Sequence, residues 1–332
     1  MLFKKLQTSE ELKNLVRSKE IELPIEQSPA WRKFDLTRGR KHHGWILYQP
    51  GGEPRAILAL VEFNIHGFSY LWSKHAPVWL GDAPDEEQEA EFFRSFRSFV
   101  RKEFPKVVFA RISAWHRSPD LKPLLNALTY DQTVIVDLQK SEEEILAGMS
   151  QTGRYEVRKG AKNPDLKIIE RTGDAAAFDK CYQIYQETAS RSGFGIHPKE
   201  VYADMLESLG PKHCRLFVAE HGGEPVAWAI VTVYDRHGVY YYAGSNRQAM
   251  KLLAPIQLQW KIIQQLKSEG VKEYDLMGIA SDLSPQLSGV SRFKLKFTRE
   301  ATTIPADWEL PVRIFTFAAL QLAKKVKKAL KK

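Results

Sequence analysis

The chain has 332 residues, of which 43% are hydrophobic and 11% aromatic, and it carries a formal net charge of +9. This length and apolar content fit two ordinary domains and exclude a largely disordered protein. The basic balance favours an anionic partner, such as nucleic acid, a phosphorylated substrate or acidic lipid.

Helix and strand signals alternate along the first part of the chain. Residues 9–19 and 85–104 are predicted to be helices, and the second has its phenylalanines on one face and acids in its first turn. Strands are expected at residues 106–112 and 133–138. We interpret the later strand as the one that closes the first domain.

A second series of elements opens with Ser141 and Glu144, which have the spacing of a capping box. We place the domains at residues 1–140 and 141–305, followed by a segment at 306–332. Within the second domain, helices are expected at residues 151–162, 174–192, 198–209 and 254–269, and strands at residues 167–170, 215–220 and 271–277.

Two stretches of the chain repeat each other at a distance of 171 positions. Gly51-Gly52-Glu53-Pro54 recurs as Gly222-Gly223-Glu224-Pro225, and His66-Gly67 recurs as His237-Gly238. Each copy predicts a hairpin with a Gly-Gly turn before it and a His-Gly turn within it. The repeat is too long for a solenoid unit. We therefore expect an α+β fold made of tandem duplicated GNAT-like domains of the acyl-CoA N-acyltransferase type, an assignment that rests on analogy of element order.

The segment at 306–332 has apolar residues at roughly helical spacing with lysines between them, which predicts an amphipathic basic helix. Three interpretations fit this helix. It packs back on the first domain, it lies on an anionic membrane surface, or it binds RNA phosphates.

Other cations gather in two segments. Arg154, Arg158, Lys159 and Lys162 lie on one predicted helix, which is a candidate anion-binding surface or simply a solvated face. Residues 289–297 place Arg292, Lys294 and Lys296 among apolar residues. If this segment is a strand, the three cations share one face.

Several common catalytic motifs are missing. A GNAT domain that uses acetyl-CoA needs a Gly-rich loop at a helix start to hold the pyrophosphate, and neither hairpin is followed by one. Cys181 and Cys214 have no metal-ligand spacing, so we expect free thiols, no metal and no cofactor. No signal peptide or membrane-spanning run is recognisable, and we expect a cytoplasmic protein.

The second domain carries motifs in a recognisable order. They are Arg191-x-Gly-Phe, Tyr240-x-Tyr-Ala-Gly-Ser, Ala254-Pro255, Tyr274-Asp275-x-x-Gly-Ile and Gly289-Val-x-Arg-Phe-Lys-x-x-Phe. In these motifs the chain resembles the Fem family of peptidoglycan interpeptide-bridge aminoacyltransferases (FemA, FemB, FemX), in a compact FemX-like form without a coiled-coil arm. The resemblance implies two GNAT-like domains, aminoacyl-tRNA as co-substrate, and a UDP-linked or lipid-linked muramyl peptide precursor as acceptor.

The resemblance also implies roles for single residues. Lys294, with Phe293, is expected near the reacting ester. The residues expected to bind the acceptor are Trp31, Lys33, Arg191, Tyr202, Tyr242 and Arg292. The tRNA is expected to meet Arg154, Arg158, Lys159, Lys162 and the basic helix. One departure is Ser113, which stands where some family members carry an acid.

The mechanism implied is attack of the acceptor amine on the aminoacyl ester. The enzyme mainly holds two substrates together, with Lys294 stabilising the oxyanion and with Lys33 and Arg191 on the diphosphate. Two alternatives remain open at this point: a Fem-like transferase acting on an amine outside peptidoglycan, and a non-catalytic module that binds tRNA or a membrane.

Overall fold

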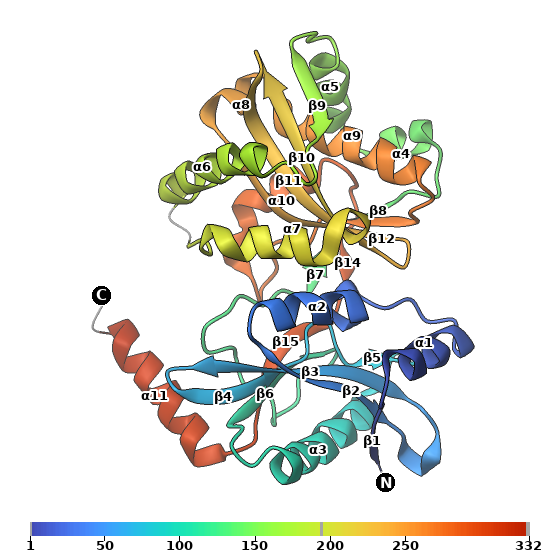
Figure 1. The fold of residues 1–332 in the computed structure, drawn as a ribbon, viewed down its shortest axis with the longest axis vertical. Helices are drawn as coiled ribbons and strands as arrows, with labels where there is room; N and C mark the ends of the chain where they lie inside the picture. The colour runs from blue at the N-terminus through green and yellow to red at the C-terminus, as the bar shows by residue number, and fades with distance from the viewer. Residues whose placement is uncertain (1, 193–194, 330–332) are drawn as a thin grey trace. The chain divides into compact units, whose positions relative to one another are not determined.

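The computed structural model describes residues 2–192 and 195–329 and divides the chain into two compact units (Figure 1). Unit 1 comprises Met1–Asp131 and Ile304–Lys332, and unit 2 comprises Gln132–Thr303. Each unit is an α+β layer structure built on its own main sheet. None of the helices in the described residues combines the length and apolar character that a membrane crossing requires.

The sheet of unit 1 has seven strands in the order β1-β2-β3-β4-β6-β15, with β5 paired to β3. β4 and β6 run parallel, and the other pairs are antiparallel. The strands are β1 (Phe3–Lys5), β2 (Lys41–Tyr48), β3 (Ala56–Ile65), β4 (Phe68–Trp72), β5 (Val78–Trp79), β6 (Phe109–Ala114) and β15 (Ala306–Pro311).

Among its described residues, unit 1 has four α-helices. They are α1 (Ser9–Ser18), α2 (Pro29–Thr37), α3 (Glu86–Glu103) and α11 (Ile314–Ala329), with short 3₁₀ turns η1 (Ile25–Gln27) and η2 (Pro50–Gly52). The predicted helix at 85–104 is confirmed: Asp85 and Gln88 form a capping box, and Phe92, Phe93 and Phe96 are fully buried. The burial of these rings fixes α3 on the sheet.

Within the part of unit 2 that the structure describes, the main sheet has six strands in the order β8-β13-β12-β11-β10-β9, of which only β12 and β13 pair in parallel. They are β8 (Ile135–Asp137), β9 (Leu166–Glu170), β10 (Cys214–His221), β11 (Glu224–Tyr234), β12 (His237–Ser245) and β13 (Glu273–Asp275). A separate pair joins β7 (Gln132–Thr133) to β14 (Thr302–Thr303).

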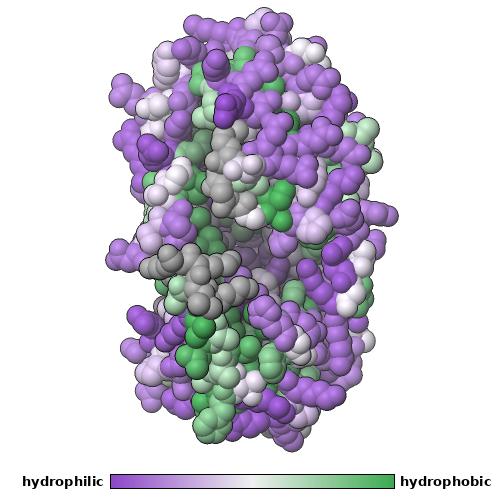
Figure 2. Space-filling model, turned by 90° about the vertical axis from the view of Figure 1, so that its left-hand side faces the viewer, coloured by the Kyte–Doolittle hydropathy of each residue, from purple (hydrophilic) through white to green (hydrophobic). Residues whose placement is uncertain are grey.

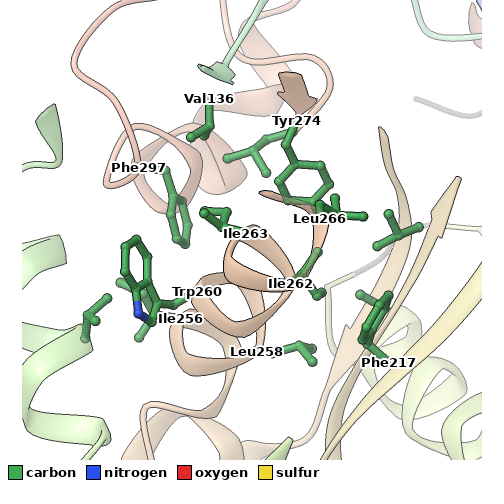
Figure 3. Close-up of a cluster of buried hydrophobic side chains, with 14 of the residues drawn as sticks. Val136, Phe217, Ile256, Leu258, Trp260, Ile262, Ile263, Leu266, Tyr274 and Phe297 are labelled. Carbon is green, nitrogen blue, oxygen red and sulfur yellow. The ribbon is translucent and has the colours of Figure 1, made fainter. Parts of the chain in front are cut away.

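The helices of unit 2 cover both faces of its main sheet. They are α4 (Glu142–Gly148), α5 (Gln151–Gly160), α6 (Ala175–Ser192), α7 (Lys199–His213), α8 (Arg247–Lys251), α9 (Ala254–Ser268) and α10 (Ser288–Lys294), with the 3₁₀ turn η3 (Pro285–Leu287). Figure 3 shows the core on one face, where Ile262, Ile263 and Leu266 of α9 lie among Val136 of β8, Tyr274 of β13 and Phe297. The predicted capping box of Ser141 and Glu144 is present on α4.

The predicted repeat corresponds to equivalent strands in the two units. β3 and β4 form one hairpin, and β11 and β12 form the other. The Gly-Gly turns are confirmed, since Gly51, Gly52, Gly222 and Gly223 all have φ between 60° and 91°, a region that glycine enters at no steric cost.

The second His-Gly turn was predicted wrongly. The chain turns at Asp235 and Arg236, which have φ of 45° and 63°, and His237 and Gly238 already belong to β12. Gly238 is required there for space, because a Cβ would lie 2.8 Å from Leu266 Cδ1. Glycine is therefore required at position 238 because α9 packs closely against it, and not because the chain turns there.

The predicted domain boundary was also wrong. The strand at 133–138 does not close the first domain: β8 pairs with β13 in unit 2, and Val136 lies in the unit 2 core. The strand that completes the sheet of unit 1 is β15, which pairs with β6 from the other end of the chain. Periodicity shows that a strand exists but not which sheet it joins, so the boundary at residue 140 could not be corrected from sequence.

A buried ion pair fixes β15 on β6. Arg111 of β6 and Glu309 of β15 lie opposite each other, with 2.6 Å between Nη2 and Oε1 and exposures of 1% and 0%. The same guanidinium donates to Asn126 Oδ1 at 2.7 Å, and Glu309 Oε1 accepts the Leu125 N–H at 3.0 Å. Because both charges are desolvated, each depends on the other.

We predict that Glu309→Ala destabilises the protein far more than an ordinary surface change. Removing one partner leaves an uncompensated buried guanidinium, which costs roughly 3–5 kcal/mol. Urea unfolding followed by circular dichroism measures the change. Glu300→Ala is the matched control, because Glu300 is exposed. Equal midpoints for the two variants would contradict the importance of the pair.

Candidate functional site

Unit 1 contains a small cavity with aromatic walls. Its volume is about 10 Å³, roughly the space of one water molecule, and it is lined by Glu26, Trp31, Asp35, Ala59, Val61, Phe63, Trp72 and Lys74. The Lys74 ammonium lies 5.1 Å from the ring centroid of Trp31 and 4.8 Å from that of Trp72. Such cation–π contacts hold a charged amine in a partly apolar place. Trp31, predicted to bind substrate, is therefore a buried wall of this cavity.

The charges around this cavity are balanced by pairing. Asp35 is bound to Arg40 at 2.7 Å, and Glu26 lies 3.7 Å from His75. Burial lowers the pKa of Lys74, and the neighbouring Arg40 adds to this effect, whereas the carboxylates of Glu26, Asp35 and Asp307 oppose it. The cavity thus places an ammonium beside two indole faces, in a space that admits little more than one water-sized group.

A carboxylate that the sequence did not indicate lies beside Ser113. Asp307 of β15 is the register partner of Ser113 on β6, and the Ser113 hydroxyl donates to Asp307 Oδ1 at 2.7 Å. Asp307 is also close enough to influence Lys74. The family resemblance leads us to expect an acid at the position of Ser113. In this chain the acid is Asp307, on the neighbouring strand. The alternation of Asp307 and Glu309 in the sequence was the available signal, but it does not reveal the partner strand.

Lys294 lies at the end of α10, so the strand considered for 289–297 was wrong. Its ammonium donates to the carbonyl oxygens of Met277 at 3.1 Å and Gly278 at 2.8 Å. Burial lowers its pKa to about 8, while the charge of Asp275 opposes the shift. Phe293 packs on the unit 2 core and against the ring of Phe297.

The loop that receives Lys294 is held in an uncommon conformation. Met277 has φ of 63°, a left-handed geometry that costs a non-glycine residue about 1–2 kcal/mol. The Asp275 carboxylate accepts the Met277 N–H at 2.7 Å and the Thr133 hydroxyl. Ser291 of α10 accepts the Ala280 N–H at 2.8 Å. Strain held in place by such contacts is typical of functional loops.

The other two cations of this segment do not share a face with Lys294. Lys296 is paired with Glu156 of α5 at 2.6 Å, and Arg292 is exposed. Because α10 is a helix, its side chains do not alternate as they would in a strand. The three cations therefore do not form the basic row expected for a strand. Lys294 alone points toward the loop at 277–278.

The two predicted pocket tyrosines meet in an aromatic cluster. The rings of Tyr202 on α7 and Tyr242 on β12 are 4.8 Å apart and nearly perpendicular, and Tyr185 of α6 lies 5.8 Å from Tyr202. The Tyr202 hydroxyl accepts the His197 N–H at 2.9 Å. Tyr202 is only 1% exposed, so it supports this cluster rather than an open surface.

Tyr240 and Tyr242 lie on opposite faces of the sheet, although regular alternation along a strand would place them on the same face. The register between β11 and β12 shifts after Ile230, which pairs with Tyr242, while Val231 pairs with Tyr240. A bulge of this kind redirects the side chains that follow it. Tyr240 therefore packs on the α9 face, and Tyr242 faces the opposite cluster around Tyr202.

Two further acceptor residues have less definite surroundings. Lys33 is exposed on α2. Arg191 is in the last turn of α6, but its side chain lies outside the described residues. Lys33 belongs to unit 1 and Arg191 to unit 2, and their joint contact with a diphosphate stays a prediction.

The basic helix α5 is only partly available to an anion. Arg154 donates to the carbonyl oxygens of Ala147 at 3.1 Å and Met149 at 2.6 Å. Its side chain therefore caps the C-terminal end of α4. Arg158, Lys159 and Lys162 are exposed. Within the described part of the chain, no group of three or more His, Cys, Asp or Glu side chains could hold a metal ion.

Comparison with known proteins gives a sequence relation for part of the chain. Residues 148–294 match the acetyltransferase (GNAT) domain model. The UDP-N-acetylmuramoylpentapeptide-lysine N(6)-alanyltransferase of Weissella viridescens is 31% identical over 133 residues, which cover 40% of this chain and 39% of that protein. The aminoacyltransferase FemA of Staphylococcus epidermidis is 26% identical over 112 residues, 33% of this chain and 27% of that one.

Structural comparison extends the likeness to both units. The crystal structure of FemX superimposes with a TM-score of 0.73 at 13% identity, covering 98% of this chain and 100% of the other. Two GNAT-like units in tandem are therefore confirmed as the fold. The resemblance to the Fem family is also confirmed, although the matched segments span well under half of the relatives' own length.

We predict that Lys294 titrates near pH 8 rather than near its ordinary value of about 10.4. Because the folded pKa lies below the unfolded one, the unfolded state binds more protons between these values, and Lys294 adds stability as pH rises through that window. Nuclear magnetic resonance of ¹³Cε-labelled lysine measures the midpoint. The assigned signal must vanish in Lys294→Met, and a midpoint above about 10 would show that the ammonium is not desolvated.

Proposed function

We propose that the chain is a tRNA-dependent aminoacyltransferase that attaches an amino acid to the side-chain amine of the diamino acid in a peptidoglycan precursor. The observation that carries this proposal is Lys294, a half-buried lysine with a lowered pKa whose ammonium donates to two carbonyl oxygens. It lies in the GNAT domain of a chain related to a lysine N(6)-alanyltransferase. We place the reaction in the cytoplasm, with a UDP-linked or lipid-linked acceptor.

The helix starts that follow the two hairpins support a donor other than a coenzyme A thioester. The first turn of α3 is already capped by Asp85 and carries Glu86, Glu87 and Glu89, which repel a pyrophosphate. After the second hairpin, the start of the short helix α8 is capped by Asn246, and the first turn of α9 contains Pro255, which has no N–H to donate. Aminoacyl-tRNA needs no such pyrophosphate site. Its phosphates would meet the exposed cations of α5.

The reaction forms one amide bond and breaks one ester bond. The neutral acceptor amine attacks the ester carbonyl carbon, and the tetrahedral intermediate expels the terminal ribose hydroxyl of the tRNA. Lys294 stabilises the negative charge that develops on the carbonyl oxygen, which a positioned donor does best in a desolvated site. Its ammonium is already oriented by the Met277 and Gly278 carbonyls, so little reorganisation is needed.

Unit 1 supplies what the acceptor requires. The aromatic cavity with Lys74 suits a polar group of the precursor, and exposed Lys33 suits its phosphates. Asp307 is the acid that we assign to the acceptor: its carboxylate attracts the ammonium form and accepts one of its protons before attack. On becoming an amide the ammonium loses two protons: one ends on the released tRNA hydroxyl, and the other passes through Asp307 to solvent, so the reaction releases one proton.

We predict that the purified chain, mixed with a pool of charged tRNAs and UDP-N-acetylmuramyl pentapeptide containing lysine, increases the precursor mass by one amino-acid residue. Lys294→Ala should lower kcat by about 10²–10³-fold, as loss of an oxyanion donor does. Mass spectrometry of the muramyl peptide identifies the product and names the amino acid.

Lys261→Ala is the matched control, because Lys261 is an exposed lysine of the same unit. It should transfer at the wild-type rate. No mass increase with UDP-linked or lipid-linked acceptor, from protein shown to be folded, would refute the proposed reaction. Full activity in Lys294→Ala would instead refute the role of that lysine.

A further inference from the structure

Helix α11 has two apolar faces, and only one of them is used by the fold. On the inner face, Phe317 is 2% exposed and its ring packs against Phe109 of β6 at 5.4 Å. Leu320 packs on the same core cluster, and Lys324 donates to the Leu124 carbonyl at 2.7 Å. These contacts attach α11 to unit 1 and fix which side of the helix faces outward.

The outer face carries large apolar side chains that nothing in unit 1 covers. Phe315 is 93% exposed, Leu322 63% and Val326 50%. Their spacings of seven and four residues follow the helical turn of about 3.6 residues, so they form one stripe. Ile314, 57% exposed, widens this stripe at its start. Figure 2 shows apolar side chains gathered along the lower half of this face of the molecule.

The charge on this segment has a single sign. Residues 313–332 contain six lysines and one arginine, and no aspartate or glutamate. Lys325 is exposed beside the apolar stripe. A helix with a stripe of exposed apolar side chains in a segment that is basic and free of acids is the pattern of a helix that lies in a membrane interface.

We propose that α11 docks unit 1 on the surface of an anionic lipid bilayer, with Phe315, Leu322 and Val326 inserted among the acyl chains and the lysines on the headgroups. Charge complementarity commits the surface to this partner, because lysines near an anionic membrane each add attraction. An RNA would use the lysines but not a stripe of exposed apolar side chains. A second copy of the chain would bring the same positive charge to the contact, which disfavours pairing.

This inference does not depend on the proposed reaction. Docking would keep the protein at a surface where lipid-linked substrates lie, but an inactive chain would bind in the same way. The inner contacts of Phe317 and Lys324 leave α11 attached to unit 1, so the outer stripe is presented without any unfolding of the unit.

Flotation with the full chain tests the proposal. Vesicles of equal parts phosphatidylglycerol and phosphatidylcholine should bind the protein at least tenfold better than pure phosphatidylcholine. The triple variant Phe315→Gln/Leu322→Gln/Val326→Gln should lose at least tenfold in binding, and Lys325→Glu should lose severalfold. The control is Met250→Gln, which changes an equally exposed apolar side chain in unit 2 and should bind as the wild type does.

Each result decides between partners. Equal binding of the triple variant and the wild type, or equal binding to neutral and anionic vesicles, would overturn the proposal. So would a dimer in light scattering that the triple variant abolishes, or binding of a short RNA that competes fully with vesicles and survives the triple substitution. Because the three side chains are exposed, circular dichroism should show that the variant folds; if it does not, Lys325→Glu and Phe315→Gln alone decide.

Discussion

Unit 1 completes its sheet only when a strand from the far end of the chain returns to it. The buried pair of Arg111 and Glu309 joins this strand to its neighbour, and loss of either charge would leave the other desolvated without its partner. Two consequences follow from this one pairing. Cross-strand register places Asp307 on Ser113, and α11, which begins directly after β15, is set on the same unit with its outer stripe exposed.

Unit 2 uses a different device to position its cation. The Lys294 ammonium donates hydrogen bonds to two backbone carbonyls instead of to solvent. Those carbonyls belong to a loop in which Asp275 holds Met277 in a left-handed conformation. The ammonium is therefore held in a fixed position and is partly removed from solvent, as stabilisation of a developing oxyanion requires. The bulge in β12 adds the second feature, because it directs Tyr242 to the tyrosine cluster.

Local signals in the sequence predicted local structure well. The Gly-Gly turns, the capping box of Ser141 and the buried face of α3 depend on neighbours within a few residues, and all are present. The failures are long-range. Pairing of β8 and β15, the partnership of Asp307 with Ser113 and the bulge in β12 depend on which strands meet, and periodicity carries no such information. Family resemblance indicated Lys294, but only the structure shows what holds it.

The central claim is that Asp307 of β15 supplies the carboxylate that position 113 does not have, since this chain carries Ser113 there. Moving the carboxylate across the strand pair tests this claim most directly. Single-turnover transfer to the muramyl precursor would be measured for Asp307→Ser and for the exchange Ser113→Asp/Asp307→Ser. We expect the single change to slow transfer by about 10²-fold or more and the exchange to restore most of the rate. Undiminished transfer by Asp307→Ser would contradict the account.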